Sequence, residues 1–148
     1  FILCSFAASS NAYLENYTEA LKIIAHIFAH PEIKKTVWLE TILSVLQILF
    51  LSEAGEEYQS FLKNLKRRLP ESKGAETAEF IVISYLEEML NVRTESEGFK
   101  LASRTLDRLE KIKEERSYIN FTDHFDVVAW LESKINGRPI LELAKNRR

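Results

Sequence analysis

The chain has 148 residues, of which 46% are hydrophobic and 28% are charged, and its formal net charge is −2. This length is enough for one globular domain with a substantial core. The near-neutral charge excludes a general electrostatic attraction to nucleic acid or to acidic membranes. The four Gly and three Pro are too few for the many turns of a β-rich chain. The composition therefore predicts an all-α fold made of few, long helices.

The N-terminal part contains two predicted helices, because apolar residues recur at intervals of three and four. The first covers about residues 2–14, and its many small residues let a neighbouring helix approach closely. Asn16 interrupts the pattern, and Tyr17 opens the second helix. Pro31 ends that helix, because the residue before a proline is pushed out of the α region. Cys4, the single cysteine, is expected to be a small core residue of the first helix.

The stretch Val37–Leu51, VWLETILSVLQILFL, has eleven apolar residues among fifteen. A helix that is apolar around most of its circumference must be covered on several sides. The stretch is too short to span a bilayer, which needs about 20 apolar residues. We therefore predict a central buried helix that begins near Glu32 or Lys35, with Leu46 on its inner face.

Four polar residues interrupt this central helix, and their spacing places them on one narrow stripe. They are Glu40, Thr41, Ser44 and Gln47. Polar side chains on an otherwise buried helix need a reason, and a groove that receives a binding partner would supply one. The alternative is that the stripe makes local hydrogen bonds.

Local signals mark the ends of the next helices. Gly55 predicts a left-handed C-cap for the central helix. Glu56 and Glu57 suit the positively polarised first turn of the helix that follows. Residues 70–74 form the clearest loop, and a fifth helix is predicted from about Ala75 to Val92.

Capping signals also define the last three predicted helices. Thr94 and Glu97 have the spacing of a capping box, which would start the sixth helix. Asn120 is predicted to start the seventh helix, and Gly137 closes it. Pro139 then opens a last short helix.

Seven or eight helices with short connections predict a single domain over residues 1–148, built as stacked antiparallel helix pairs. The pairs would begin near residues 1, 33, 76 and 121. This spacing is close to the roughly 34 to 47 residues of helical-repeat families, although it is irregular. Trp38 and Trp130 are both expected in the core.

One segment, residues 8–31, resembles a tetratricopeptide repeat (TPR). Its sequence, ASSNAYLENYTEALKIIAHIFAHP, has a small residue on the first helix, an aromatic residue near the turn, an early alanine and a later apolar residue on the second helix, and a closing proline. These positions are Ala8, Tyr17, Ala20, Ile24 and Pro31. The chain departs from the repeat at Cys4, Asn11 and Ile27.

The whole chain is also similar to a group of bacterial TPR-like proteins of unassigned function. In that group a segment resembling FDVVAWLESKINGRP comes near the C-terminus, and the corresponding segment here is Phe125–Pro139. The resemblance implies a TPR-like helical-repeat portion of a longer polypeptide. It implies no catalytic residues.

Residues that could carry chemistry are better explained as structural. His26 and His30 share a helix face, but zinc needs three or four ligands and no third ligand is near in the sequence. His124 is flanked by Asp123 and Asp126, but no nucleophile is tied to it. We therefore expect no metal site, no cofactor and no enzymatic activity. A hydrolase hidden in an all-α fold is the minor alternative.

Basic residues form three clusters in the sequence. They are Lys63, Lys66, Arg67 and Arg68; Arg104, Arg108, Lys111 and Arg116; and Lys145, Arg147 and Arg148. If these residues met on one face, they would contact phosphate groups. Acidic residues interleave with them, so the preferred interpretation is mixed surface charge, and nucleic acid is not the expected partner.

The sequence thus predicts a protein-interaction module that binds a peptide or partner domain, in cis or in trans, in a groove between first helices of the pairs. The candidate groove residues are Asn11, Tyr13, Glu40, Ser44 and Gln47. The alternative is a sensor or nucleic-acid-binding domain of a transcription regulator that uses the basic clusters. A single cysteine allows no disulfide within the chain, so we expect a cytoplasmic protein without a membrane partner.

Overall fold

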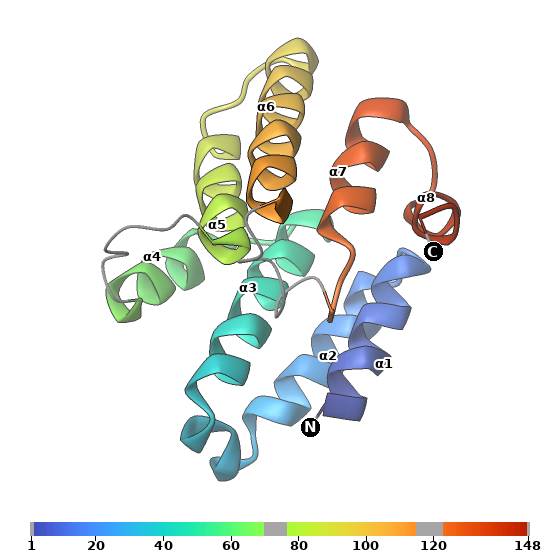
Figure 1. The fold of residues 1–148 in the computed structure, drawn as a ribbon. Coiled ribbons are helices and arrows are strands. Elements are labelled where there is room, and N and C mark those ends of the chain that lie inside the picture. Colours follow the sequence, from blue (N-terminus) through green and yellow to red (C-terminus); the bar gives the residue numbers. More distant parts are fainter. Residues whose placement is uncertain (1, 70–76, 115–122, 148) are drawn as a thin grey trace. The chain divides into compact units, whose positions relative to one another are not determined.

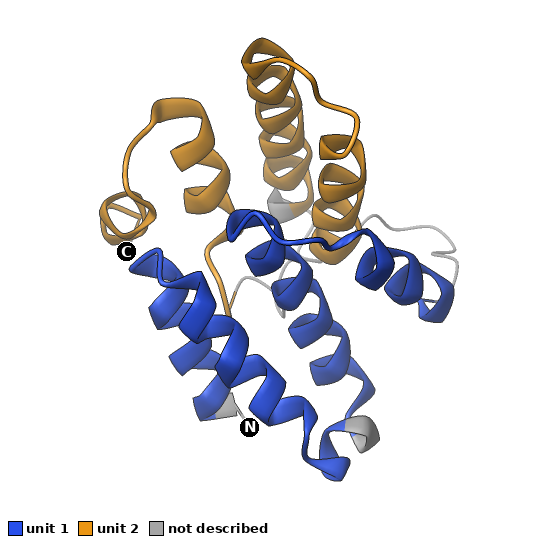
Figure 2. Cartoon of the chain, turned by 180° about the vertical axis from the view of Figure 1, so that it is seen from behind, with its two compact units in different colours: residues 1–71 blue, residues 72–148 orange. Residues whose placement is uncertain are grey.

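The structure, a computed structural model, describes residues 2–69, 77–114 and 123–147. Every regular element in these ranges is a helix, and eight of them are α-helices, which confirms the predicted all-α class (Figure 1). The chain divides into two compact units, residues 1–71 and 72–148 (Figure 2). The single domain over the whole chain and the TPR-like stacking of its helix pairs stay predictions.

The first unit, over its described residues, is a row of helices in chain order. They are α1 (Ile2–Tyr13), α2 (Tyr17–Phe28), the 3-10 helix η1 (Pro31–Lys35), α3 (Val37–Glu53) and α4 (Gln59–Arg68). Helix α2 packs against both α1 and α3, and α4 packs against α3. Helices α1, α2 and α3 run alternately up and down (Figure 1). Helix α3 therefore has a helical neighbour on each side.

The second unit contains the remaining four described helices. They are α5 (Ala78–Met89), α6 (Glu95–Glu114), α7 (Val127–Asn136) and α8 (Ile140–Lys145). Helix α6 packs against both α5 and α7, and α8 packs against α7. Each unit thus links its helices mainly through neighbours in the chain.

Helix α3 forms the apolar centre of the first unit, as predicted. It buries nine of its 17 residues. Leu43, Leu46 and Phe50 are completely inaccessible to solvent. Because α2, η1 and α4 all pack against α3, apolar side chains on several faces of this helix are removed from water.

Helix α1 buries small side chains and exposes large ones. The buried residues are Ser5, Ala8, Ser9 and Ala12. Leu3 is 82% exposed, and Phe6 is also exposed. The expectation that Cys4 is a core residue is wrong, because Cys4 lies on the exposed part of the helix. The small buried side chains allow close packing against α2.

Several predicted helix ends are confirmed. Gly55 and Gly137 have positive φ angles of 72° and 65°, a conformation that glycine adopts without steric cost. Asn16 caps α2, since its side-chain oxygen accepts a hydrogen bond from the Glu19 N–H. The Glu57 carboxylate accepts one from the Ser60 N–H at the start of α4.

Other predicted boundaries are wrong. Helix α3 begins at Val37 rather than near Glu32 or Lys35, because Pro31–Lys35 forms the separate helix η1. A proline at the first position lacks only an N–H that would be unpaired anyway, so this short helix starts at Pro31. Helix α5 covers Ala78–Met89 rather than about Ala75–Val92. The predicted loop at residues 70–74 lies outside the described residues.

The seventh predicted helix starts later than expected. Helix α7 begins at Val127 rather than at Asn120, which lies outside the described residues. The Asp126 side chain accepts a hydrogen bond from the Ala129 N–H over 2.9 Å. This bond satisfies one of the free N–H groups at the helix start, so Asp126 is the cap.

Trp130 of α7 lies in the core of the second unit, as predicted. It is 1% exposed, and its ring meets that of Tyr85 edge to face with centroids 5.3 Å apart. The core placement predicted for Trp38 is wrong, because this residue is 49% exposed in the first turn of α3.

The predicted capping box at the start of α6 is confirmed. The Glu97 N–H donates to Thr94 Oγ1 over 3.2 Å. In return, the N–H groups of Arg93 and Thr94 donate to the Glu97 carboxylate over 2.9 and 3.1 Å. These backbone hydrogen bonds hold the pKa of Glu97 below its usual value.

Replacing Glu97 with Gln should remove a pH-dependent contribution to stability. Because the pKa is lower in the folded state, ionised Glu97 stabilises the fold above the unfolded pKa of about 4.3. This contribution is lost as the pH falls through the folded pKa. The difference in free energy of unfolding between parent and Glu97→Gln should therefore be largest near neutral pH and shrink in acid.

Urea titrations at several pH values measure this difference. Glu110→Gln is the matched control, since Glu110 lies exposed on the same helix outside the capping box. The stability difference between parent and Glu97→Gln could instead stay constant from neutral pH to pH values below the folded pKa. That result would contradict the lowered pKa of Glu97.

Candidate partner-binding groove

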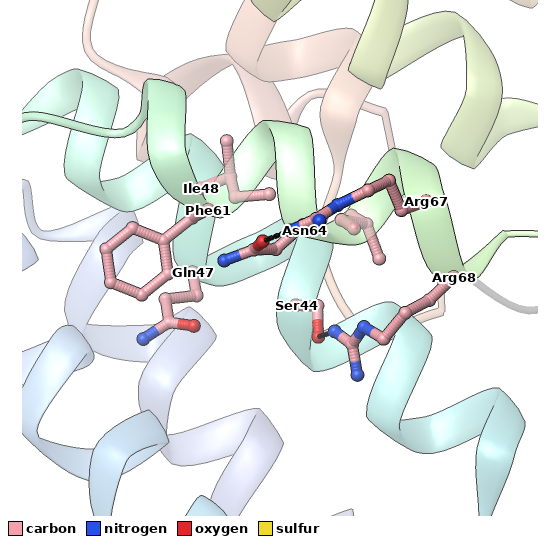
Figure 3. Close-up of a pocket in the computed structure, with 8 residues that line it drawn as sticks. Ser44, Gln47, Ile48, Phe61, Asn64, Arg67 and Arg68 are labelled. Atoms are coloured by element: carbon pink, nitrogen blue, oxygen red, sulfur yellow. Dashed lines mark hydrogen bonds between the residues drawn. The ribbon is translucent and has the colours of Figure 1, made fainter.

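A groove of about 540 Å³ lies between α3 and α4 in the first unit (Figure 3). It is lined by Ser44, Gln47, Ile48, Phe61, Asn64, Leu65, Arg67 and Arg68. Positions 44, 47 and 48 on α3 have helical spacing, and so do 61, 64, 65 and 68 on α4. Each set therefore forms one face of its helix, and the two faces border the groove along its length.

The floor of the groove is apolar, and one end carries groups that the fold leaves unused. Ile48 and Leu65 are buried, whereas Phe61 is 42% exposed. Gln47 is half-buried, and its side-chain amide has no hydrogen-bond partner among the described residues. Phe61 and Gln47 lie side by side in the close-up (Figure 3). This end therefore presents an aromatic surface next to an amide.

The other end of the groove is held by a polar contact between α3 and α4. Arg68 Nη1 lies 2.5 Å from Glu40 Oε1, and Arg68 Nη2 donates to Ser44 Oγ over 3.4 Å. Ser44 Oγ in turn donates to the Glu40 backbone carbonyl over 2.7 Å. Arg68 thus connects the polar stripe of α3 to the end of α4.

Arg67 differs from Arg68 in its surroundings. It lines the groove and is exposed. Its guanidinium donates to the Asn64 side-chain oxygen, and it forms no ion pair within the described part of the chain. Among the described residues at this end, two guanidinium groups therefore face one carboxylate, which leaves a local excess of positive charge.

Two members of the predicted stripe on α3, Ser44 and Gln47, line the groove, whereas Glu40 and Thr41 do not. Glu40 and Ser44 contact Arg68, whereas Gln47 stays available to a ligand. Asn11 and Tyr13 lie on α1, outside the groove lining. The Asn11 amide donates to the Ala7 carbonyl over 3.0 Å in its own helix. The groove lies between the two helices of one predicted pair. A binding role for Asn11 and Tyr13, and the predicted groove between first helices of the pairs, stay predictions.

The α4 side of the groove does not follow from the apolar pattern. Phe61 has the helical spacing of the buried Leu65, yet α4 is short and only Leu62 and Leu65 are buried on it. The only sequence signal for the α4 face of the groove was the helical spacing of Phe61, Asn64 and Arg68. This spacing places the three residues on one face of α4, but it does not predict which face of α3 they meet.

The three histidines are not part of the groove lining. His26 and His30 are exposed, and their rings stack edge to face with centroids 5.3 Å apart. No group of three or more His, Cys, Asp or Glu side chains in the described ranges is placed to hold a metal ion. His124 is buried, and burial lowers its pKa, against the opposing effect of the Asp123 charge.

Each basic cluster contributes an ion pair to the protein itself. Arg68 pairs with Glu40, Arg104 with Glu88, and Arg147 with Glu132 and Asp126. Arg116 and Arg148 lie outside the described residues. Part of the basic charge is therefore used internally, as expected for a mixed surface.

A smaller hollow of about 380 Å³ in the second unit surrounds the start of α6. Its lining includes the partly exposed Phe99, together with Thr94 of the capping box. The polar groups there serve to begin the helix. The α3–α4 groove is larger and keeps polar groups free, so it is the better candidate.

No protein-family model, curated protein or solved structure matches the chain. None of the helices in the described ranges is long and apolar enough to cross a membrane.

Replacing Gln47 with Ala should change the free energy of unfolding by no more than about 0.5 kcal/mol, as for ordinary surface positions. The reason is that Gln47 is half-buried and has no hydrogen-bond partner among the described residues. Urea denaturation beside Gln59→Ala, an exposed glutamine on α4, provides the comparison. A cost of about 1–3 kcal/mol would instead show that Gln47 belongs to a buried hydrogen-bonded seam.

Proposed function

We propose that this chain is a non-enzymatic protein-interaction module with a TPR-like helical-repeat fold. It binds a peptide or a segment of a partner domain, in cis or in trans, in the α3–α4 groove. The observation that carries the proposal is the exposed aromatic ring of Phe61 beside the unused amide of Gln47, above a floor of buried Ile48 and Leu65. Aromatic side chains and apolar floors with few polar groups are typical of sites that receive a peptide.

The placement of the groove between two packed helices supports the same function. Helical scaffolds hold their binding residues on rigid elements, so little ordering is needed when a partner binds. A cytoplasmic location is part of the proposal, and its support is the single cysteine.

The alternative is a nucleic-acid-binding domain of a regulator, because Arg67 and Phe61 could contact a phosphate and a base. The ion pairs of Arg68, Arg104 and Arg147 weigh against this alternative. The dependence on salt separates the two functions. Binding through several phosphates weakens steeply with salt, whereas binding through an apolar groove weakens little.

Selection from a displayed library of random peptides tests the proposed function. The parent chain should enrich peptides whose binding, measured by fluorescence anisotropy, is lost or at least tenfold weaker in Phe61→Ala. Phe99→Ala is the matched control, because Phe99 is 38% exposed and lies in the second unit. Circular dichroism verifies that both variants fold.

Two results would overturn the proposal. One is the absence of any enrichment over an unrelated helical protein. The other is enriched peptides that bind Phe61→Ala as well as they bind the parent. If the chain binds a labelled single-stranded oligonucleotide more tightly than any selected peptide, and this binding weakens steeply with salt, the result would favour the nucleic-acid-binding alternative.

A further inference from the structure

The α3–α4 groove changes in chemical character along its length. In Figure 3, Phe61 and Gln47 lie at one end, Arg67 and Arg68 at the other, and Asn64 between them. Phe61 and Arg67 are six residues apart on α4. At 1.5 Å per residue, this separation is about 9 Å along the helix axis. The groove therefore has an apolar end and a cationic end at a defined spacing.

The cationic end has one charge without an acidic partner among the described residues. Arg68 is paired with Glu40. Arg67 contacts only the neutral side chain of Asn64 within the described residues, and it is exposed at the groove. A guanidinium with free N–H groups is well suited to bind a carboxylate by two parallel hydrogen bonds.

From this arrangement we infer that the occupant is a peptide segment with an apolar side chain and a carboxylate about 9 Å apart, the apolar group on Phe61 and the carboxylate on Arg67. The inference rests on the proposed function. In a helical ligand, the pair on one face that comes nearest to this spacing is i and i+7, about 10 Å apart. In an extended ligand, at about 3.3 Å per residue, it corresponds to positions i and i+3.

A peptide carboxylate fits the groove better than a nucleic-acid backbone. Among the described residues of the groove, one guanidinium lacks a carboxylate partner, and the Glu40 carboxylate lies beside the other. Phosphates that follow one another along a strand would meet this negative charge and be repelled. The apolar floor of Ile48 and Leu65 suits an aliphatic or aromatic side chain.

Peptide selection on charge-reversed variants tests the inference. The same random library is selected on the parent chain, on Arg67→Glu and on Lys111→Glu. Lys111→Glu is the matched control, since it makes the same charge change on exposed α6. Circular dichroism verifies folding, and Arg67→Gln provides a second variant that removes the charge without reversing it.

Peptides selected on the parent and on Lys111→Glu should carry Asp or Glu at i+7 or i+3 from an apolar residue. Peptides selected on Arg67→Glu should carry Lys or Arg there instead. A parent-selected peptide should bind Arg67→Gln about tenfold more weakly. Changing its acidic residue to Lys should restore binding to Arg67→Glu.

The outcomes distinguish the two levels of proposal. The enriched peptides could need Phe61 for binding, yet carry no acidic residue at either spacing and bind Arg67→Glu as well as the parent. That result would overturn this inference and leave the proposed function standing. No enrichment on the parent chain would overturn both. If the parent chain binds a labelled oligonucleotide more tightly than the selected peptides, and Arg67→Glu loses that binding, the cationic end binds phosphate. This result would also overturn the inference.

Discussion

Replacing Leu46 with Ala should lower the free energy of unfolding by about 2–5 kcal/mol. The side chain is completely buried on α3, so the truncation loses its transfer free energy and leaves a cavity that the neighbouring helices fill only in part. For a domain with a typical stability of about 5–15 kcal/mol, this loss is a large fraction of the total. Equilibrium urea denaturation followed by far-UV circular dichroism measures the change.

The same substitution at an exposed leucine in the first unit provides the control. Leu3 is 82% exposed on α1, so Leu3→Ala should alter the free energy of unfolding by no more than about 0.5 kcal/mol. Equal effects of the two substitutions would show that α3 is not the apolar centre of its unit.

Trp130→Ala should cost about 3–5 kcal/mol, since it removes the largest buried side chain of the second unit and its edge-to-face contact with Tyr85. Trp130→Phe should cost much less. Phenylalanine keeps an aromatic ring in the site, and it removes a buried indole N–H that has no hydrogen-bond partner among the described residues. Urea denaturation of both variants beside the parent measures these costs.

Trp38 allows a control in the same experiment. It is 49% exposed, so Trp38→Ala should have a far smaller effect on stability than Trp130→Ala. Fluorescence quenching by acrylamide gives an independent check. In a Trp38→Phe variant the tryptophan emission comes from Trp130 alone, so acrylamide should quench it only weakly. Strong quenching of that variant in the native state would contradict the burial of Trp130.

Local patterns were sufficient to predict most of the secondary structure. The apolar circumference of Val37–Leu51 predicted a buried helix, and Gly55 and Gly137 marked helix ends that the structure confirms. One error occurs where two capping residues lie a short distance apart. Asp126, not Asn120, caps α7, and both residue types are good N-caps, so only tertiary contacts decide between them.

Half of the candidate groove could be predicted from the sequence. The polar stripe on α3 stands out because its helix is otherwise apolar. The α4 half could not be predicted, since Arg67 and Arg68 are ordinary charges on an amphipathic helix until the partner helix is known. The contact of Arg68 with Glu40 joins positions 28 residues apart, and no periodicity in the sequence encodes such a pair.

The packing of α1 has a practical consequence for experiments on this chain. Small residues fill the contact with α2, and the sole cysteine, Cys4, lies on the exposed part of α1. An exposed thiol reacts with maleimide reagents without any mutation, and a single thiol guarantees one dye or spin label per molecule. The attachment point lies on α1, whereas the groove lies between α3 and α4. A reporter placed there can follow ligand binding without occupying the site.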